Sequence, residues 1–164
     1  MDVFATGAIL RSIRTYVDTS VFGGTQELEF HVASQAFFDR VRRGDFVVLT
    51  SELVTFELEY APASVRAVIE GLAPEMLEYV SITAEVEALA DAYIRAGALG
   101  HASRQDAVHV AAATVYRADL IVSWNFKHIV NYSRIKKFNG ANAIEGYGTI
   151  DIRSPLEVVH DVKS

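Results

Sequence analysis

The sequence predicts an α/β domain organised around a parallel sheet. Three observations carry this prediction: candidate strands and helices alternate along the chain, the run at 119–123 is apolar enough to be covered on both faces, and no repeat or linker divides the sequence. A length of 164 residues suffices for one domain with one core. We expect this domain at residues 15–164, after an N-terminal extension at 1–14 that forms an extra helical turn or a disordered leader.

The composition narrows the class of protein. Hydrophobic residues make up 51% of the chain, yet no apolar run approaches the roughly 18 to 20 residues that span a bilayer, so we expect a soluble protein without a membrane partner. The absence of cysteine excludes disulfides and thiolate sites, and it favours a reducing, cytoplasmic setting. A net charge of −6 argues against a nonspecific nucleic-acid coat. It does not exclude a nuclease, because an acidic metal site itself lowers the charge and Arg134, Lys136 and Lys137 form a local basic patch.

The first half of the chain predicts alternating elements bounded by capping residues, Gly and Pro. In order, these are a strand at 15–17, a helix at 27–43, a strand at 46–50, a helix at 52–61 that Pro62 ends, a short helix at 63–72, a brief strand or connector at 79–82 and a helix at 83–96. Asp18, Thr19 and Ser20 follow the first strand directly. An acid with two hydroxyls there suits a cation or phosphate site, and it equally suits a helix cap.

The stretch at 103–131 contains the densest pattern in the chain, "SRQDAVHVAAATVYRADLIVSWNFKHIVN". Ser103 is placed to cap a helix, in which Asp106 and His109 share a face because they are three residues apart. An apolar strand at 119–123 follows, and the polar residues after it lie where open α/β sheets bind ligands. A Gly-rich connection and a last strand at 149–152 complete the predicted elements.

Three acids are candidates for one site. The carboxyl ends of parallel strands meet at one edge of a sheet, so Asp18, Glu57 and Asp106 can lie close together although they are distant in sequence. Clustered carboxylates repel one another unless a cation lies among them, and hard oxygen ligands select Mg²⁺ or Mn²⁺. Such a site suits metal-activated hydrolysis of phosphodiesters. The alternative for Glu57 alone is an ordinary solvated surface residue.

The residues also resemble a known family. "YVDTSVF", "TSELVTFELEYA" and "RQDAVHVAAATVYRADLIVSWNFKHIVN" look like the three signature blocks of PIN-domain proteins, and the last block resembles VapC-like toxins of bacterial toxin–antitoxin modules. The resemblance covers most of residues 15–155. It implies a three-layer α/β/α sandwich on a parallel sheet, Mg²⁺- or Mn²⁺-dependent cleavage of RNA, a homodimer and an antitoxin protein that inserts into the acidic groove.

The resemblance assigns the acids one by one. Asp18 matches the first family acid, Glu57 the second and Asp106 the third, and these three are the expected metal ligands. Glu52 is the rival to Glu57, which the "Ser-x-x-x-Thr-x-Glu-Leu" spacing favours. Asn125 stands where many members have a fourth acid, so we place it among the catalytic residues, but it brings no charge. This departure favours one metal, or a weak second one, and puts catalytic strength in doubt.

The polar and aromatic residues near the acids are candidates for substrate binding. Thr19 and Ser20 suit a phosphate, and the cations at Lys127 and His128 suit one too, with a solvated loop as the alternative for the latter pair. His109 orders water or phosphate in one interpretation and makes a structural hydrogen bond in the other. Trp124 stacks on a nucleobase or packs inside the protein.

Two other functions remain open from the sequence. Asn125 favours a PIN-like module that binds RNA or protein without turnover. A phosphatase with Asp18 as nucleophile is the weakest alternative, because Ser20 stands where that chemistry needs a second acid.

Overall fold

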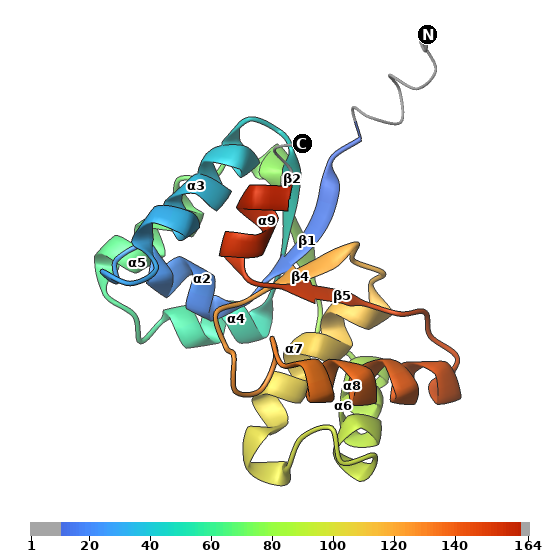
Figure 1. The fold of residues 1–164 in the computed structure, drawn as a ribbon. Helices are drawn as coiled ribbons and strands as arrows, with labels where there is room; N and C mark the ends of the chain where they lie inside the picture. The colour runs from blue at the N-terminus through green and yellow to red at the C-terminus, as the bar shows by residue number, and fades with distance from the viewer. Residues whose placement is uncertain (1–10, 162–164) are drawn as a thin grey trace, which may run out of the picture.

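The computed structural model describes residues 11–161. Its centre is a sheet of five parallel strands in the order β3-β2-β1-β4-β5 (Figure 1). The strands are β1 (Ile13–Val17), β2 (Phe46–Ser51), β3 (Leu77–Val80), β4 (Leu120–Val122) and β5 (Asp151–Arg153).

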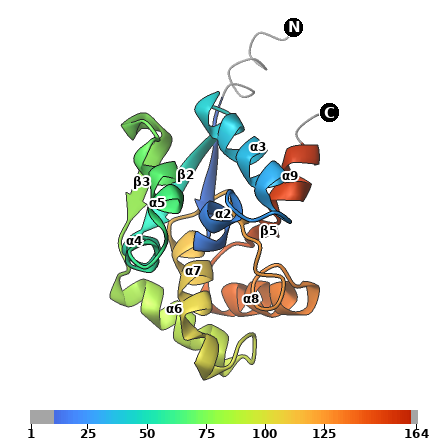
Figure 2. The same cartoon turned by 90° about the vertical axis from the view of Figure 1, so that its left-hand side faces the viewer.

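Helices cover both faces of the sheet. They are α2 (Thr19–Gly24), α3 (His31–Arg42), α4 (Glu52–Leu58), α5 (Ala63–Glu70), α6 (Ala84–Arg95), α7 (Arg104–Val115), α8 (Tyr132–Glu145) and α9 (Pro155–Asp161), with short 3₁₀ turns at Pro74–Met76 and His101–Ser103. Helices α2, α3, α5 and α9 lie on one side, and α6, α7 and α8 lie on the other (Figures 1 and 2). The predicted three-layer α/β/α sandwich is therefore confirmed.

The helices pack closely against both faces of the sheet. The rings of Phe22, Phe37, Phe38 and Phe46 contact one another on the α3 side. On the other side α7 is buried on all sides from Ala107 to Thr114, because it lies between the sheet and α6. Its alanines let both neighbours approach closely, and its apolar residues lie on all of its sides.

The element predictions fail mainly in the last third of the chain. The predicted Gly-rich connection is helix α8, which starts where the Asn131 side chain accepts the Arg134 N–H and ends at Gly146, with φ of 90°. Helices α2 and α9 are also absent from the predictions. The predicted cap at Ser103 is wrong, since its side chain makes no capping hydrogen bond.

The boundary of the predicted extension falls inside the sheet. Strand β1 begins at Ile13, which pairs with Phe46 of β2, so the residues just before Thr15 belong to the domain. Residues 1–10 lie outside the described part of the chain. Within residues 11–161, no helix is both long enough and apolar enough to cross a membrane.

The strand order places a switch point between β1 and β4. The chain runs outward from β1 through β2 to β3, and it then returns to add β4 and β5 on the other side of β1. Open α/β sheets bind ligands in the crevice at such a reversal, just beyond the carboxyl ends of the strands. Val17 pairs with Val122 there, so Asp18 and Ser123 leave the sheet side by side.

Candidate active site

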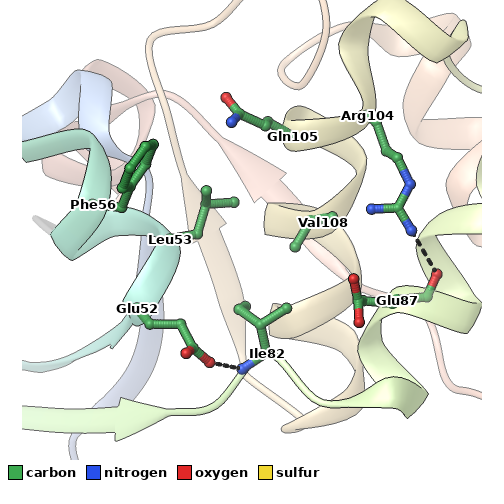
Figure 3. A pocket seen from close by; sticks show the side chains of 8 residues that line it. All are labelled: Glu52, Leu53, Phe56, Ile82, Glu87, Arg104, Gln105 and Val108. Atoms are coloured by element: carbon green, nitrogen blue, oxygen red, sulfur yellow. Dashed lines mark hydrogen bonds between the residues drawn. The ribbon is translucent and has the colours of Figure 1, made fainter.

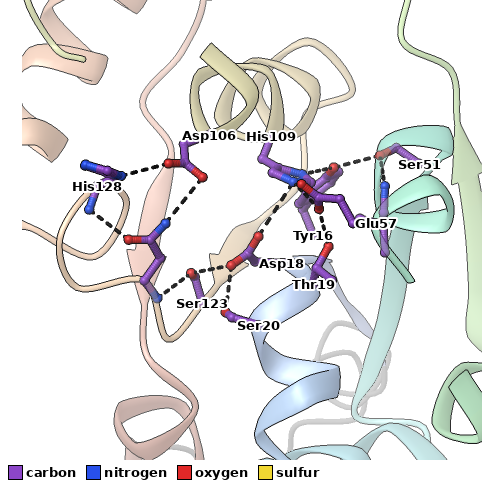
Figure 4. A network of polar contacts seen from close by, with 12 residues as sticks. Tyr16, Asp18, Thr19, Ser20, Ser51, Glu57, Asp106, His109, Ser123 and His128 are labelled. Carbon is purple, nitrogen blue, oxygen red and sulfur yellow. Dashed lines mark hydrogen bonds and ion pairs between the residues drawn. The ribbon is translucent and has the colours of Figure 1, made fainter. Parts of the chain in front are cut away.

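Asp18 lies at the switch point and is nearly buried, with 8% of its side chain exposed. Its backbone N–H donates to the Val122 carbonyl at 3.0 Å, which continues the β1–β4 pairing by one residue. Its Oδ2 accepts hydrogen bonds from Ser20 Oγ at 2.6 Å and Ser123 Oγ at 2.8 Å (Figure 4). Asp18 stands at the N-cap position of α2, but its side chain makes no capping bond. The capping alternative for its carboxylate is therefore wrong.

Glu57 reaches the same space from α4. Its Oε1 accepts hydrogen bonds from Thr19 Oγ1 and from His109 Nε2, the latter at 2.9 Å. Burial by itself raises the pKa of the Glu57 carboxyl, but the hydrogen bond and charge of His109, together with Thr19, outweigh it and lower the pKa. Glu57 is thus held ionised. The glutamate chosen from the sequence is therefore one that reaches the same space as Asp18.

His109 lies at the centre of the inner part of the site and is 1% exposed. A carboxylate only accepts hydrogen bonds, so Nε2 carries a proton toward Glu57, while Nδ1 lies 2.7 Å from Tyr16 Oη. Tyr16 Oη lies in turn 2.8 Å from Ser51 Oγ. Burial lowers the pKa of His109, but the hydrogen bond to Glu57 and the charges of the three acids together raise it. The three predicted acids therefore surround one buried ring.

These contacts decide the alternatives for His109. A buried ring with both nitrogens bonded inside the protein is a structural hydrogen-bonding residue, as one interpretation of the sequence had it. The substrate-contacting interpretation is wrong, because the ring offers no exposed nitrogen. Burial also raises the pKa of Tyr16, so its hydroxyl stays protonated and able to donate.

Asp106 comes from the first turn of α7 and faces the loop after β4. Its Oδ1 accepts from Asn125 Nδ2 at 3.3 Å, and its Oδ2 accepts from His128 Nδ1 at 2.9 Å (Figure 4). Burial raises the pKa of the Asp106 carboxyl, the His128 hydrogen bond lowers it, and the nearby charge of Asp18 raises it again, with a net rise. Asp18 and Asp106 are therefore close enough to repel each other.

The donor set fits a hard cation, although the ligands are not assembled around one. Within residues 11–161, no group of three or more His, Asp or Glu side chains is placed to hold a metal ion. The repulsion between Asp18 and Asp106 is the kind of electrostatic strain that a divalent cation between two carboxylates relieves. Oε1 of Glu57 accepts from His109 and Thr19, and a carboxylate has a second oxygen that can ligate a cation without breaking these contacts. The three acids thus fit Mg²⁺ or Mn²⁺ in chemistry.

The loop after β4 carries the remaining candidate residues, of which some are buried and others are exposed. Trp124 is 9% exposed, stacks on Phe30 at 4.2 Å between ring centroids and donates its indole N–H to Ser34 Oγ at 2.8 Å. It is a packing residue, so the nucleobase-stacking interpretation is wrong for it. Phe126 and Lys127 are the exposed residues of this loop. His128 is one-quarter exposed and contacts Asp106 instead of standing free as a phosphate ligand.

Sequence reasoning missed three members of the site. Tyr16 and Ser51 complete the hydrogen-bonded chain to His109, and Ser123 connects to Asp18. The position of Ser123 at the end of a predicted strand was the available signal, because it shares that position with Asp18. Nothing in the local pattern distinguishes Tyr16 from an ordinary strand residue.

A groove borders the acids on the outer sides of α4 and α7. Its volume is ≈ 520 Å³, and Leu53, Phe56, Ile82 and Val108 form its apolar lining (Figure 3). Glu52 lies in this groove, where its Oε1 accepts the Ile82 N–H, so the rival to Glu57 is occupied away from the acids. The groove and the site share two helices, with Phe56 next to Glu57.

Comparison with known proteins finds similarity in structure alone. No protein-family model matches the sequence, and no curated protein matches it. A chain of VapBC2 from Rickettsia felis, solved bound to a DNA fragment from its promoter, superposes with a TM-score of 0.56 at 12% identity, over 87% of this chain and 98% of that one. VapC20 of Mycobacterium tuberculosis, a toxin that cleaves the sarcin–ricin loop, gives 0.49 at 19% identity, over 65% and 86%. The first match shows that the two chains share a fold.

Proposed function

Because this chain has the PIN-domain fold, we propose that it is a Mg²⁺- or Mn²⁺-dependent endoribonuclease, the toxin of a toxin–antitoxin pair. One observation carries the proposal: Asp18, Glu57 and Asp106 come from three different elements and surround His109 at the switch point of the sheet. Three acids gathered in one partly buried place are a donor set that suits a divalent cation.

Each side chain has a distinct part in this proposal. Asp18 and Asp106 hold the cation, and Glu57 completes the set through its second carboxylate oxygen while Oε1 stays on His109. A bound cation supplies an activated water and neutralises the charge that develops on the phosphate. Ser20 and Ser123 fix Oδ2 of the Asp18 carboxylate through two hydroxyl hydrogen bonds, and Oδ1 lies 3.7 Å from His109 Nε2.

The substrate contacts come from the exposed side chains around the acids. Lys127 lies on the loop that carries Asn125, and its cation suits an RNA phosphate. In this structure the hydroxyls of Thr19 and Ser20 donate to Glu57 and Asp18. Their first role is therefore to orient the acids, and substrate binding comes second. Phe126, with half of its surface exposed, replaces Trp124 as the ring open to a nucleobase.

The test is Mn²⁺ binding by calorimetry, followed by RNA cleavage in the same buffer. We expect Asp18→Asn and Asp106→Asn each to abolish measurable Mn²⁺ binding and to slow cleavage by at least about 100-fold, since each removes a charged ligand. Asp39→Asn is the matched control, because this aspartate is 71% exposed on α3 and pairs only with Arg42 among the contacts resolved here. Full binding and cleavage in both site variants would remove these acids from the mechanism.

A second function is favoured by a specific observation. Glu57 is bonded to His109, Asn125 brings no charge, and the described residues contain no assembled three-ligand metal group. A PIN-like module that binds RNA or protein without turnover fits these facts. Saturating Mn²⁺ distinguishes the two functions, because the module retains RNA binding and shows no cleavage.

We also propose two protein partners in the cytoplasm, a second copy of the chain and an antitoxin. The apolar groove beside the site ends at Phe56, which is 49% exposed, and exposed apolar surface of this kind marks a protein contact. We assign the groove to the second copy. Light scattering on the wild type and on Phe56→Glu checks this assignment, with a dimer expected for the first and a monomer for the second. Co-purification with a co-expressed antitoxin tests the other partner.

A further inference from the structure

The loop after β4 contacts both oxygens of the Asp106 carboxylate. Asn125 Nδ2 donates to Oδ1 at 3.3 Å, and His128 Nδ1 donates to Oδ2 at 2.9 Å. The loop also closes on itself, since Asn125 Oδ1 accepts the His128 backbone N–H at 2.9 Å. Asp106, Asn125 and His128 thus form a closed ring of three hydrogen bonds (Figure 4).

The same asparagine is connected to the first acid. The backbone N–H of Asn125 donates to Ser123 Oγ at 2.9 Å, and that hydroxyl donates to Asp18 Oδ2 at 2.8 Å. A continuous path of hydrogen bonds therefore runs from Asp18 through Ser123 and Asn125 to Asp106. The link to Asp18 uses the backbone N–H of residue 125, and the link to Asp106 uses the asparagine side chain.

An amide is required for this arrangement. Asn125 uses its NH₂ group as a donor to Asp106 and its oxygen as an acceptor from His128, and a carboxylate has no donor to offer. An aspartate at this position also brings a second negative charge against Asp106 Oδ1. In the wild type the Asn125 oxygen is occupied by the His128 N–H, so it is not directed at a cation.

We propose that the Asn125 side chain is a positioning residue for Asp106, acting with His128, and that it is not a ligand standing in for a fourth acid. This inference rests on the proposed function and makes a counterintuitive prediction about it. Restoring an acid at position 125 weakens the site instead of strengthening it.

The first experiment needs no metal. Exchange of the Asn125 side-chain amide protons is followed by NMR in EDTA for the wild type and for Asp106→Ala. We expect slow exchange in the wild type and at least about tenfold faster exchange in the variant, because the acceptor is gone. The Asn139 amide, which donates to the Ile150 carbonyl, is the internal control and stays unchanged. Equal exchange of the Asn125 amide in both proteins overturns the inference.

The second experiment measures Mn²⁺ affinity and RNA cleavage for Asn125→Ala and Asn125→Asp. Loss of a residue that orients a metal ligand weakens metal binding by about 10- to 100-fold, and we expect this for both variants. We expect kcat to fall with little change in KM, since the Asn125 side chain is bonded to Asp106 and His128 inside the site. Gln26→Glu is the control for an added charge, because Gln26 is exposed and lies outside both the acidic site and the groove.

The outcomes separate this inference from the proposed function. Tighter Mn²⁺ binding or faster cleavage by Asn125→Asp identifies position 125 as a ligand position and overturns the inference, while the nuclease stands. A wild type that neither binds Mn²⁺ nor cleaves RNA overturns the nuclease, and the metal-free amide exchange then decides the positioning role alone.

Discussion

The two histidines of the site make similar contacts in different surroundings. His109 donates to Glu57 and His128 donates to Asp106, both at 2.9 Å, but 2% of the His109 side chain is exposed against 24% of the His128 side chain. The inner pair joins α7 to α4 and, through Tyr16, to β1. The outer pair joins α7 to a surface loop. The inner half of the site is therefore part of the core, and the outer half lies at the surface.

Removing each histidine in turn gives the largest expected difference. His109→Ala leaves a cavity and an uncompensated acid in a buried place, so we expect a loss of about 3–5 kcal/mol in the free energy of unfolding. His128→Ala should cost below about 1 kcal/mol, because water replaces a partly exposed pair. Urea denaturation of both variants in EDTA measures the difference. Equal losses would abolish the distinction between the two halves.

Packing beneath the outer loop is tested by Gly24→Ala. A Cβ at Gly24 lies 2.6 Å from Ser34 Oγ and 2.7 Å from Trp124 Nε1, so the rigid indole has to move. We expect a loss of about 1–3 kcal/mol from overpacking, which exceeds the gain in helix propensity. Gly23→Ala is the matched control, because its Cβ meets only Glu27 Oε1, at 3.9 Å. Thermal unfolding followed by tryptophan fluorescence reports directly on Trp124; an equal effect of both substitutions would contradict the packing argument.

The hydroxyl partners of the two histidines give a smaller effect. Tyr16→Phe removes a buried partner of His109 Nδ1, and we expect a loss of about 1–2 kcal/mol. Ser103 Oγ, 3.4 Å from His128 Nε2, is the equivalent on the outer side, and Ser103→Ala should change stability by less than about 0.5 kcal/mol. Urea midpoints of the two variants check this order, and the reverse order would show that the outer pair is the structural one.

The pH dependence of stability gives the smallest expected effect. The raised pKa of His109 stabilises the fold below about pH 6.5 and loses this effect as the pH rises through the folded-state pKa. The lowered pKa of Glu57 stabilises the fold above about pH 4.5 and loses this effect as the pH falls through its folded-state pKa. The His109–Glu57 pair therefore contributes most to stability between about pH 4.5 and pH 6.5. The raised pKa of Asp106 has the opposite effect to the lowered pKa of Glu57, because it reduces stability as the pH rises.

Urea midpoints in EDTA across pH 4–9 measure this profile. In His109→Gln the loss of stability on the alkaline side should become shallower, because glutamine does not titrate. His128→Gln serves as the outer comparison and should retain the alkaline slope. An unchanged slope in His109→Gln would assign the pH dependence to other groups.

The predictable part of the fold was the part with strong local patterns. The strands at 46–50 and 119–123 were found because they are apolar and sharply bounded, and their parallel order followed from the alternation with helices. Helix α8 was missed because Gly140 and several asparagines weaken its helical pattern. In the folded protein α8 is stabilised by the Asn131 cap and by the packing of the helix against α6.

The chain by itself determined where the acids lie, because Asp18 and Asp106 sit at fixed distances from strand ends and a helix start, and parallel strands bring those points to one edge. Only the tertiary structure decided what their neighbours do. His109 meets Glu57 across 52 positions, Trp124 meets Ser34 across 90, and Asn125 meets Asp106 across 19. Such contacts depend on how helices α4 and α7 and the β4 loop pack together, which no local pattern encodes. The same side chains therefore become a buried histidine, a packing tryptophan and a positioning asparagine only in the folded protein.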